Sequence, residues 1–156
     1  MPKVVISDTS CLIILSKIGE LDLLQKIYGQ VITTNDIADE FGETLPNWVE
    51  IKEVVDKVKQ NILETQLDKG ESSAIALALE MPDSILIIDD YKARVIAHKL
   101  GLSLTGTLGV IVKAKKAGII DSIKPFLRKI KQTNFRISIT LEMEALKAAD
   151  EQTMLE

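Results

Sequence analysis

A short apolar run in the middle of the chain ends in two adjacent carboxylates. The run SILII, residues 84–88, is followed directly by Asp89 and Asp90. A run of aliphatic side chains is typical of a buried strand, and charged groups at its end indicate that the chain has reached the surface. Such carboxylates either cap the helix that follows or, together with others, hold a cation.

Acidic side chains recur at comparable positions elsewhere in the sequence. Asp8 directly follows the first apolar run, Glu40 lies on the helix expected after the second, and Glu71 lies in the first turn of a later helix. In an open parallel sheet, ligands collect outside the carboxyl ends of the strands. We therefore expect Asp8, one of the two adjacent aspartates and the segment 105–107 (Thr-Gly-Thr) to meet at one edge of the sheet. Helices that run back across the sheet could add Glu40 and Glu71 there.

Carboxylates that share a cleft repel one another, and the pKa of one normally rises in response. A bound Mg²⁺ or Mn²⁺ ion removes the repulsion, because both are hard cations that prefer oxygen ligands. Such an ion can activate water and stabilise the charge that develops on a phosphoryl group. Other chemistries find little support: the sequence has no CxxC or HExxH zinc motif, no GxxxxGK[ST] or GxGxxG loop, and a single histidine, His98.

The elements that position these acids alternate between strands and helices. We expect strands at residues 4–6, 31–33, 84–88 and 102–105, with a brief further segment at 136–139. We expect helices at residues 11–28 with a break near Gly19, and at 36–41, 68–80, 90–100, 107–117, 121–131 and onward from 141. Residues 48–67 fit either a helix or a mixed segment. Uniformly apolar strands between helices predict an α/β fold, a three-layer sandwich with a central parallel sheet flanked by helices.

The bulk properties of the chain indicate one ordinary globular domain. A chain of 156 residues buries roughly 70% of its unfolded surface and needs no disulfide or zinc to fold. No apolar run reaches the roughly 18 residues of a membrane span, and the N-terminus lacks a signal-peptide layout. The single cysteine, Cys11, cannot form an internal disulfide, which fits a cytoplasmic location.

Charge is unevenly distributed along the chain. Residues 112–136 carry eight Lys or Arg and one acid, a balance of +7, whereas the whole chain carries −4, which leaves −11 for the remainder. A basic flank beside an acidic remainder suits a phosphate-rich substrate that must still approach carboxylates. Two amphipathic helices with solvated lysines explain the same pattern equally well.

Five stretches of the chain together resemble the PIN-domain superfamily. They are VISDTSCLI, the acidic helix ending in DE, DKGESSAIALALE, LIIDDYKAR and GLSLTGTLGVI. More narrowly, they resemble bacterial and archaeal PIN-like proteins of unknown function that are related to VapC-type toxins. The resemblance covers nearly the whole chain, so we expect one PIN-like domain over residues 1–156 with a C-terminal helical extension from about residue 120.

The resemblance implies a metal-dependent ribonuclease with four acidic residues that are both catalytic and metal-binding. Matched motif by motif, these are Asp8, Glu40, Glu71 and Asp90. Asp90 is preferred to Asp89 because the analogous TxD pattern of the family puts the ligand second, and Asp89 is then expected to cap the following helix. Glu71 departs from the family, whose better-known nucleases usually have aspartate at this position.

Further residues are expected to contact the substrate. Ser10 resembles the hydroxyl that the family places beside its first acid, and Thr107 is expected near the same pocket. Lys113, Lys115 and Lys116 from the basic flank are candidates to hold the RNA backbone. The resemblance also implies a small antitoxin-like protein partner, and relatives often form homodimers, for which the apolar helices between residues 12 and 24 could supply an interface.

Plainer explanations exist for each acid. Asp8 could cap the helix that begins near Ser10, Glu71 could serve only a capping box, and Glu40 could be an ordinary exposed helix residue. The chain could therefore be an inactive or weakly active PIN-like module that binds nucleic acid or a partner protein without cutting. A phosphoacceptor receiver domain also has acids at strand ends, but its acidic pair should follow the first strand, whereas here the pair, Asp89 and Asp90, comes late.

Overall fold

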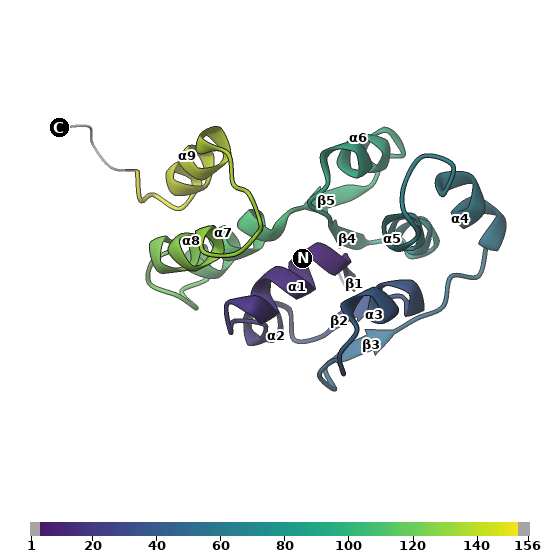
Figure 1. The fold of residues 1–156 in the computed structure, drawn as a ribbon, viewed down its shortest axis with the longest axis horizontal. Coiled ribbons are helices and arrows are strands. Elements are labelled where there is room, and N and C mark those ends of the chain that lie inside the picture. The colour runs from purple at the N-terminus through teal and green to yellow at the C-terminus, as the bar shows by residue number, and fades with distance from the viewer. Residues whose placement is uncertain (1–3, 153–156) are drawn as a thin grey trace.

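The computed structural model describes residues 4–152, which fold around a central five-stranded sheet (Figure 1). The strand order is β3-β2-β1-β4-β5, and each neighbouring pair is parallel. The strands are β1 (Val4–Ser7), β2 (Val31–Thr33), β3 (Val49–Ile51), β4 (Ser84–Ile87) and β5 (Ser103–Thr105). The parallel α/β fold expected from the sequence is confirmed.

Helices flank the sheet in layers (Figure 1). In one layer α1 and α2 pack against α7, and in another α5 packs against β1 and β4 with α4 beside it. α3 contacts both α1 and α5, and α9 packs on α7. The helices are α1 (Thr9–Lys17), α2 (Asp22–Tyr28), α3 (Asn35–Phe41), α4 (Lys57–Leu63), α5 (Lys69–Glu80), α6 (Tyr91–Lys99), α7 (Thr107–Lys116), α8 (Lys124–Lys131) and α9 (Ile139–Ala148).

The register of the sheet brings the carboxyl ends of three strands to the same level. Ser7 pairs with Ile87, and Ile87 pairs with Thr105. The pairing continues one residue further, because the Asp8 amide donates to the Ile87 carbonyl at 2.9 Å and the Ile88 amide donates to the Thr105 carbonyl at 2.9 Å. The segments that leave β1, β4 and β5 therefore begin side by side.

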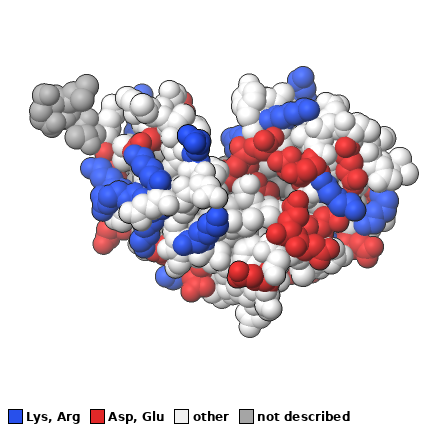
Figure 2. Space-filling model, viewed as in Figure 1, with Lys and Arg blue, Asp and Glu red and all other residues white. Residues whose placement is uncertain are grey.

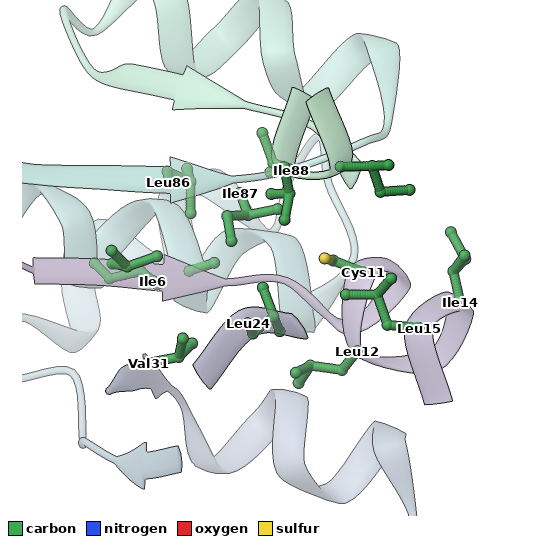
Figure 3. Close-up of a cluster of buried hydrophobic side chains, with 14 of the residues drawn as sticks. Ile6, Cys11, Leu12, Ile14, Leu15, Leu24, Val31, Leu86, Ile87 and Ile88 are labelled. Atoms are coloured by element: carbon green, nitrogen blue, oxygen red, sulfur yellow. The ribbon is translucent and has the colours of Figure 1, made fainter. Parts of the chain in front are cut away.

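The core is built from aliphatic side chains of the central strands and the first two helices (Figure 3). Ile6 and Leu86 from neighbouring strands are fully buried, as are Leu12 and Leu24 from α1 and α2. Burying a side chain of this size contributes about 1.5–3 kcal/mol. Most of the apolar side chains between residues 12 and 24 are therefore used within the chain, although Ile13 and Leu21 stay partly exposed, and the homodimer interface considered there stays a prediction.

Two segments differ from the sequence-based expectation. β3 falls in the ambiguous stretch 48–67, and its signal is weak because it is short, lies at the sheet edge and leaves Ile51 45% exposed. Residues 136–139 form no strand; instead the Ser138 hydroxyl accepts a hydrogen bond from the Leu141 amide and caps α9. Of the single domain expected over 1–156, residues 1–3 and 153–156 lie outside the described part of the chain. No helix within residues 4–152 is both long enough and apolar enough to cross a membrane.

Candidate active site

The site is located where the direction of the sheet reverses. From β1 the chain proceeds outward through β2 to β3, and it then returns to the other side of β1 to form β4 and β5. The loops that follow β1 and β4 consequently diverge, and this switch point is where open α/β sheets place their ligands. Asp8 follows β1, and the Asp89–Asp90 pair follows β4.

Asp8 is the most deeply placed of the acids, with 3% of its surface exposed. It caps α1, since its Oδ1 accepts from the Cys11 amide at 2.9 Å, and its Oδ2 accepts from the Asp89 amide at 3.0 Å. Burial raises the pKa of Asp8 well above its usual value, and the charges of Asp89 and Glu71 raise it further. Asp8 is therefore held in one orientation at the floor of the site, where burial and its acidic neighbours disfavour its ionised form.

Asp89 forms hydrogen bonds with Thr107 beneath the site. Its Oδ1 accepts from the Thr107 amide at 2.8 Å and its Oδ2 accepts from the Thr107 hydroxyl at 2.6 Å. These bonds cap the start of α7, whose own N-cap, Gly106, offers no side chain. Burial raises the pKa of Asp89, while the Thr107 hydrogen bonds and the charge of Arg94 oppose that rise. Both oxygens of Asp89 thus have defined partners.

Asp90, and not Asp89, caps α6. Its Oδ2 accepts from the Ala93 amide at 3.0 Å, as an N-cap carboxylate normally does. The expectation that Asp89 caps this helix is therefore wrong. The preference for Asp90 over Asp89 at the acidic site stays a prediction, and it gains support because Asp90 is exposed and uses only one oxygen in its cap.

Glu40 reaches the site from the end of α3 and lies against α5. Its Oε1 accepts a short hydrogen bond from the Thr9 hydroxyl, which ties α3 to the start of α1. The carboxylate also lies directly on Gly70, where an added Cβ would stand 2.0 Å from Oε1 and 2.8 Å from Cδ. Only glycine at position 70 leaves room for this approach.

Glu71 experiences the combined charge of the cluster most directly. Its pKa is raised from 4.5 to about 7, first by burial and then by the charges of Asp68, Asp90 and Glu40. Asp68 Oδ1 accepts a hydrogen bond from the Glu71 amide at 2.8 Å and caps α5. After burial, the charges of Asp68, Asp90 and Glu40 add to this rise, so these carboxylates lie within electrostatic reach of Glu71.

The acids surround a cavity of about 360 Å³ between α1, α3 and α5. Its lining comprises Asp8, Thr9, Ser10, Ile13, Glu40, Asp68 and Glu71. Figure 2 shows acidic side chains gathered over the central and right-hand part of the molecule, while lysines and arginines are frequent on the left-hand part formed by α7, α8 and α9. Three of the four predicted site acids therefore line one cavity, and the fourth, Asp90, acts on it through its charge on Glu71.

The donor set of the cavity suits a hard divalent cation, because its ligating atoms are carboxylate and hydroxyl oxygens. Within residues 4–152, no Lys or Arg nitrogen lies within 4.0 Å of a carboxylate oxygen of Asp8, Glu40, Glu71 or Asp90. The described residues nevertheless form no group of three or more Asp, Glu, His or Cys side chains close enough to hold a metal ion as they stand. To ligate one ion, the side chains would have to turn toward each other from the walls of the cavity.

The residues predicted to contact RNA fall in different places. Ser10 is exposed at the mouth of the cavity. Thr107 is completely buried and bonded to Asp89, so its predicted contact with nucleic acid is wrong. Lys115 forms an ion pair with Glu151 at 2.9 Å and donates to the Ala149 carbonyl. It holds the C-terminal segment and is unsuited to binding RNA.

The other two predicted lysines lie toward the end of α7 that points away from the sheet edge. Lys113 is placed over the ring of Tyr28, 5.3 Å from its centroid. Lys116 is exposed, and at 1.5 Å per residue it lies roughly 13 Å along the helix from Thr107. Neither position is adjacent to the acidic cavity.

Three site residues were not identified from sequence as functional. Asp68 gives only a helix-cap signal, Thr9 resembles any polar residue at a helix start, and Gly70 lies in a helix where glycine normally weakens the structure. The glycine is the one that carries a usable signal, because an unfavourable residue in the first turn of an otherwise regular helix indicates close packing.

The chain was compared with protein families, curated proteins and solved structures. A family model described as a PIN domain matches residues 4–151. No curated protein and no solved structure matches the chain. The match spans the whole described sheet, the acidic cavity and the helices that follow.

Proposed function

The chain belongs to the PIN-domain family, and on that premise we propose that it is a metal-dependent ribonuclease, toxin-like in type, that hydrolyses RNA phosphodiester bonds. The observation that carries the proposal is the crowding of carboxylates from four separate segments at the switch point of the sheet. The pKa of Glu71 is raised to about 7, first by burial and then by the charges of these neighbouring acids. Such repulsion costs stability in the free protein, and a site that binds a cation gives a reason for it.

The proposed ligands of a Mg²⁺ or Mn²⁺ ion are Asp8, Glu40, Glu71 and Asp90. When bound, the ion supplies a water of lowered pKa and neutralises charge on the phosphate. Asp8 is held by two backbone amides, so it offers a rigid anchor with one further lone pair on each oxygen. Glu40 and Glu71 enter from longer side chains and can adapt to the cation.

Two residues outside the ligand set are proposed to orient the acids. The Thr9 hydroxyl holds Glu40, and Asp89 holds α7 through Thr107 while its amide holds Asp8. The carbonyl of Ile88 accepts from Arg94 at 2.8 Å, which fixes the loop after β4. These contacts preorganise the acidic edge before any substrate binds.

The test is cleavage of RNA by the full chain with Mn²⁺, with EDTA, and after the substitution Asp8→Asn. Cleavage with Mn²⁺ should be lost in EDTA and reduced at least a hundredfold in the variant. Asp121→Asn, a change of an exposed aspartate between α7 and α8, is the matched control and should cleave normally. Equal activity under all conditions would contradict the proposal.

A second candidate function is a PIN-like module that binds nucleic acid or an antitoxin-like protein without cutting. It is favoured by the absence, within residues 4–152, of three acids close enough to share an ion. Calorimetric titration with Mn²⁺ separates the two: the nuclease binds the ion tightly at this cavity, and the inactive module shows no saturable heat that depends on Asp8.

We further propose that the protein acts in the cytoplasm, where RNA is present and the buried thiol of Cys11 stays reduced. An antitoxin-like partner and a homodimer are part of the same proposal. Exposed apolar side chains on and beside α4, such as Val55 and Val58, are 86% and 67% exposed and are available for either contact.

A further inference from the structure

A second cavity, of about 210 Å³, adjoins the acidic one along α1. It is lined by Ser10, Ile13, Ile14, Lys17, Thr133, Asn134 and Phe135. Ser10 and Ile13 line both cavities, so the two are neighbours on the same face of α1. In Figure 1, α1 lies between α8 on one side and α3 on the other.

The chemical character changes sharply between the two cavities. The first contains four carboxylates, whereas the second contains no acid, one ammonium from Lys17, one amide from Asn134 and one aromatic ring from Phe135. Within residues 4–152, Lys17 has no carboxylate within 4.0 Å. The side chain of Asn134 is exposed and forms no hydrogen bond among the described residues. These groups are therefore available to a ligand.

The loop that presents Phe135 is held in place. The Thr133 hydroxyl donates to the Ile130 carbonyl at 2.6 Å and accepts from the Phe135 amide at 3.1 Å. Phe135 is only partly buried while it packs against the core. A fixed, partly exposed ring can serve as a platform on which a base stacks without a cost of ordering the loop.

From these observations we propose that the second cavity holds the nucleotide next to the scissile phosphate of a single-stranded RNA. This inference rests on the proposed ribonuclease function. Phe135 stacks on the base, Asn134 contacts a base edge, and Lys17 with the Ser10 hydroxyl holds the phosphate between the two cavities. A polyanion is repelled by the carboxylates, so a cation on this flank is needed to hold the strand beside them.

The test is binding of a fluorescein-labelled single-stranded RNA oligonucleotide to the full chain, followed by fluorescence anisotropy in EDTA and again with Mn²⁺. Phe135→Leu keeps the apolar packing and removes the stacking surface, and Lys17→Gln removes the charge. We expect about tenfold weaker binding for Phe135→Leu, because the variant loses the surface on which one base stacks. Lys17→Gln should also weaken binding and should reduce the salt dependence by about one phosphate contact.

Lys99→Gln is the matched control, because Lys99 is exposed at the end of α6, remote from both cavities. Its binding should stay within twofold of the unchanged chain. Unchanged binding by both Phe135→Leu and Lys17→Gln overturns the inference, as does a larger loss in Lys116→Gln, which would place the strand along α7. If the chain binds no RNA in EDTA and none with Mn²⁺, the inference is overturned as well.

The failure of this inference and the failure of the proposed function give different results. RNA binding that depends on Phe135 and Lys17, without cleavage in Mn²⁺, supports the cavity and contradicts the nuclease. Metal-dependent cleavage with unchanged binding by both variants supports the nuclease and contradicts the cavity.

Discussion

The close approach of Glu40 to Gly70 makes one substitution unusually informative. Gly70→Ala adds a single methyl group in the first turn of α5, at 2.0 Å from Glu40 Oε1. Ordinary contact begins at 3.4 Å, so the carboxylate must withdraw by about 1.4 Å. Because Glu40 is exposed, its carboxylate can move without disturbing the core.

The effects of this change on stability and on function should have opposite signs. The backbone at Gly70 is not in the left-handed region, so alanine fits and stabilises by about 0.4–1 kcal/mol through the unfolded state. In a domain of this size that raises the melting temperature by about 1–4 °C. A misplacement of about 1 Å at a catalytic group costs about a hundredfold in rate, so cleavage should fall by that factor.

Two measurements decide the outcome: the RNA cleavage rate with Mn²⁺ and the melting temperature by calorimetry. Lys69→Ala is the matched control, since Lys69 is exposed in the same helical turn. Its cleavage rate should stay within twofold. Full activity in Gly70→Ala would refute the role of Glu40. A loss of activity accompanied by a lower melting temperature would show instead that the fold is damaged.

Three further predictions concern the other acidic side chains of the protein. Below pH 4.5 Glu71→Gln should have the melting temperature of the unchanged chain, and as the pH rises through about 7 the variant should become the more stable of the two. The reason is that the raised pKa of Glu71 means that its ionisation destabilises the fold. Thermal melts in EDTA check this difference, and Mg²⁺ should remove it. Asp89→Ala should lower the free energy of unfolding in urea by about 1–3 kcal/mol, since it leaves buried Thr107 groups unpaired, whereas Asp90→Ala should cost about 1 kcal/mol and should be the one that weakens Mn²⁺ binding. Glu151→Gln should lower the melting temperature above pH 4.5, and this effect should disappear toward pH 2. Burial opposes the ionisation of Glu151, but hydrogen bonds from Ser122, the Ile123 amide and Lys115 lower its pKa to about 2, so the ionised form stabilises the fold.

The sequence is informative about the sheet because buried parallel strands are continuous apolar runs. Residues 84–88 show the pattern clearly, and the register that pairs Ser7 with Ile87 then brings the acids after both strands to one edge. β3 lacks this pattern, since Glu50 and Ile51 face solvent at the sheet edge. A strand of three residues, of which one is buried and two are exposed, cannot be distinguished from a loop by periodicity.

The details of the site depend on contacts between distant segments. Two adjacent aspartates are equivalent in sequence, and only the position of Thr107 decides that Asp89 turns inward while Asp90 caps α6. The packing of Glu40 on Gly70 joins residues thirty positions apart, and no local pattern encodes it. The net charge of residues 112–136 does not reveal which lysines are free, and Lys115 is in fact paired with Glu151.

Acids distant in sequence line one cavity, and we propose that a divalent cation relieves their repulsion there. The most direct measurement is anomalous diffraction from a crystal of the full chain soaked in Mn²⁺ near pH 7.5. We predict a manganese peak in the cavity beside Asp8, with Glu40 and Glu71 turned toward it. A soaked crystal with no peak there, or with manganese only at other surface carboxylates, would contradict the claim.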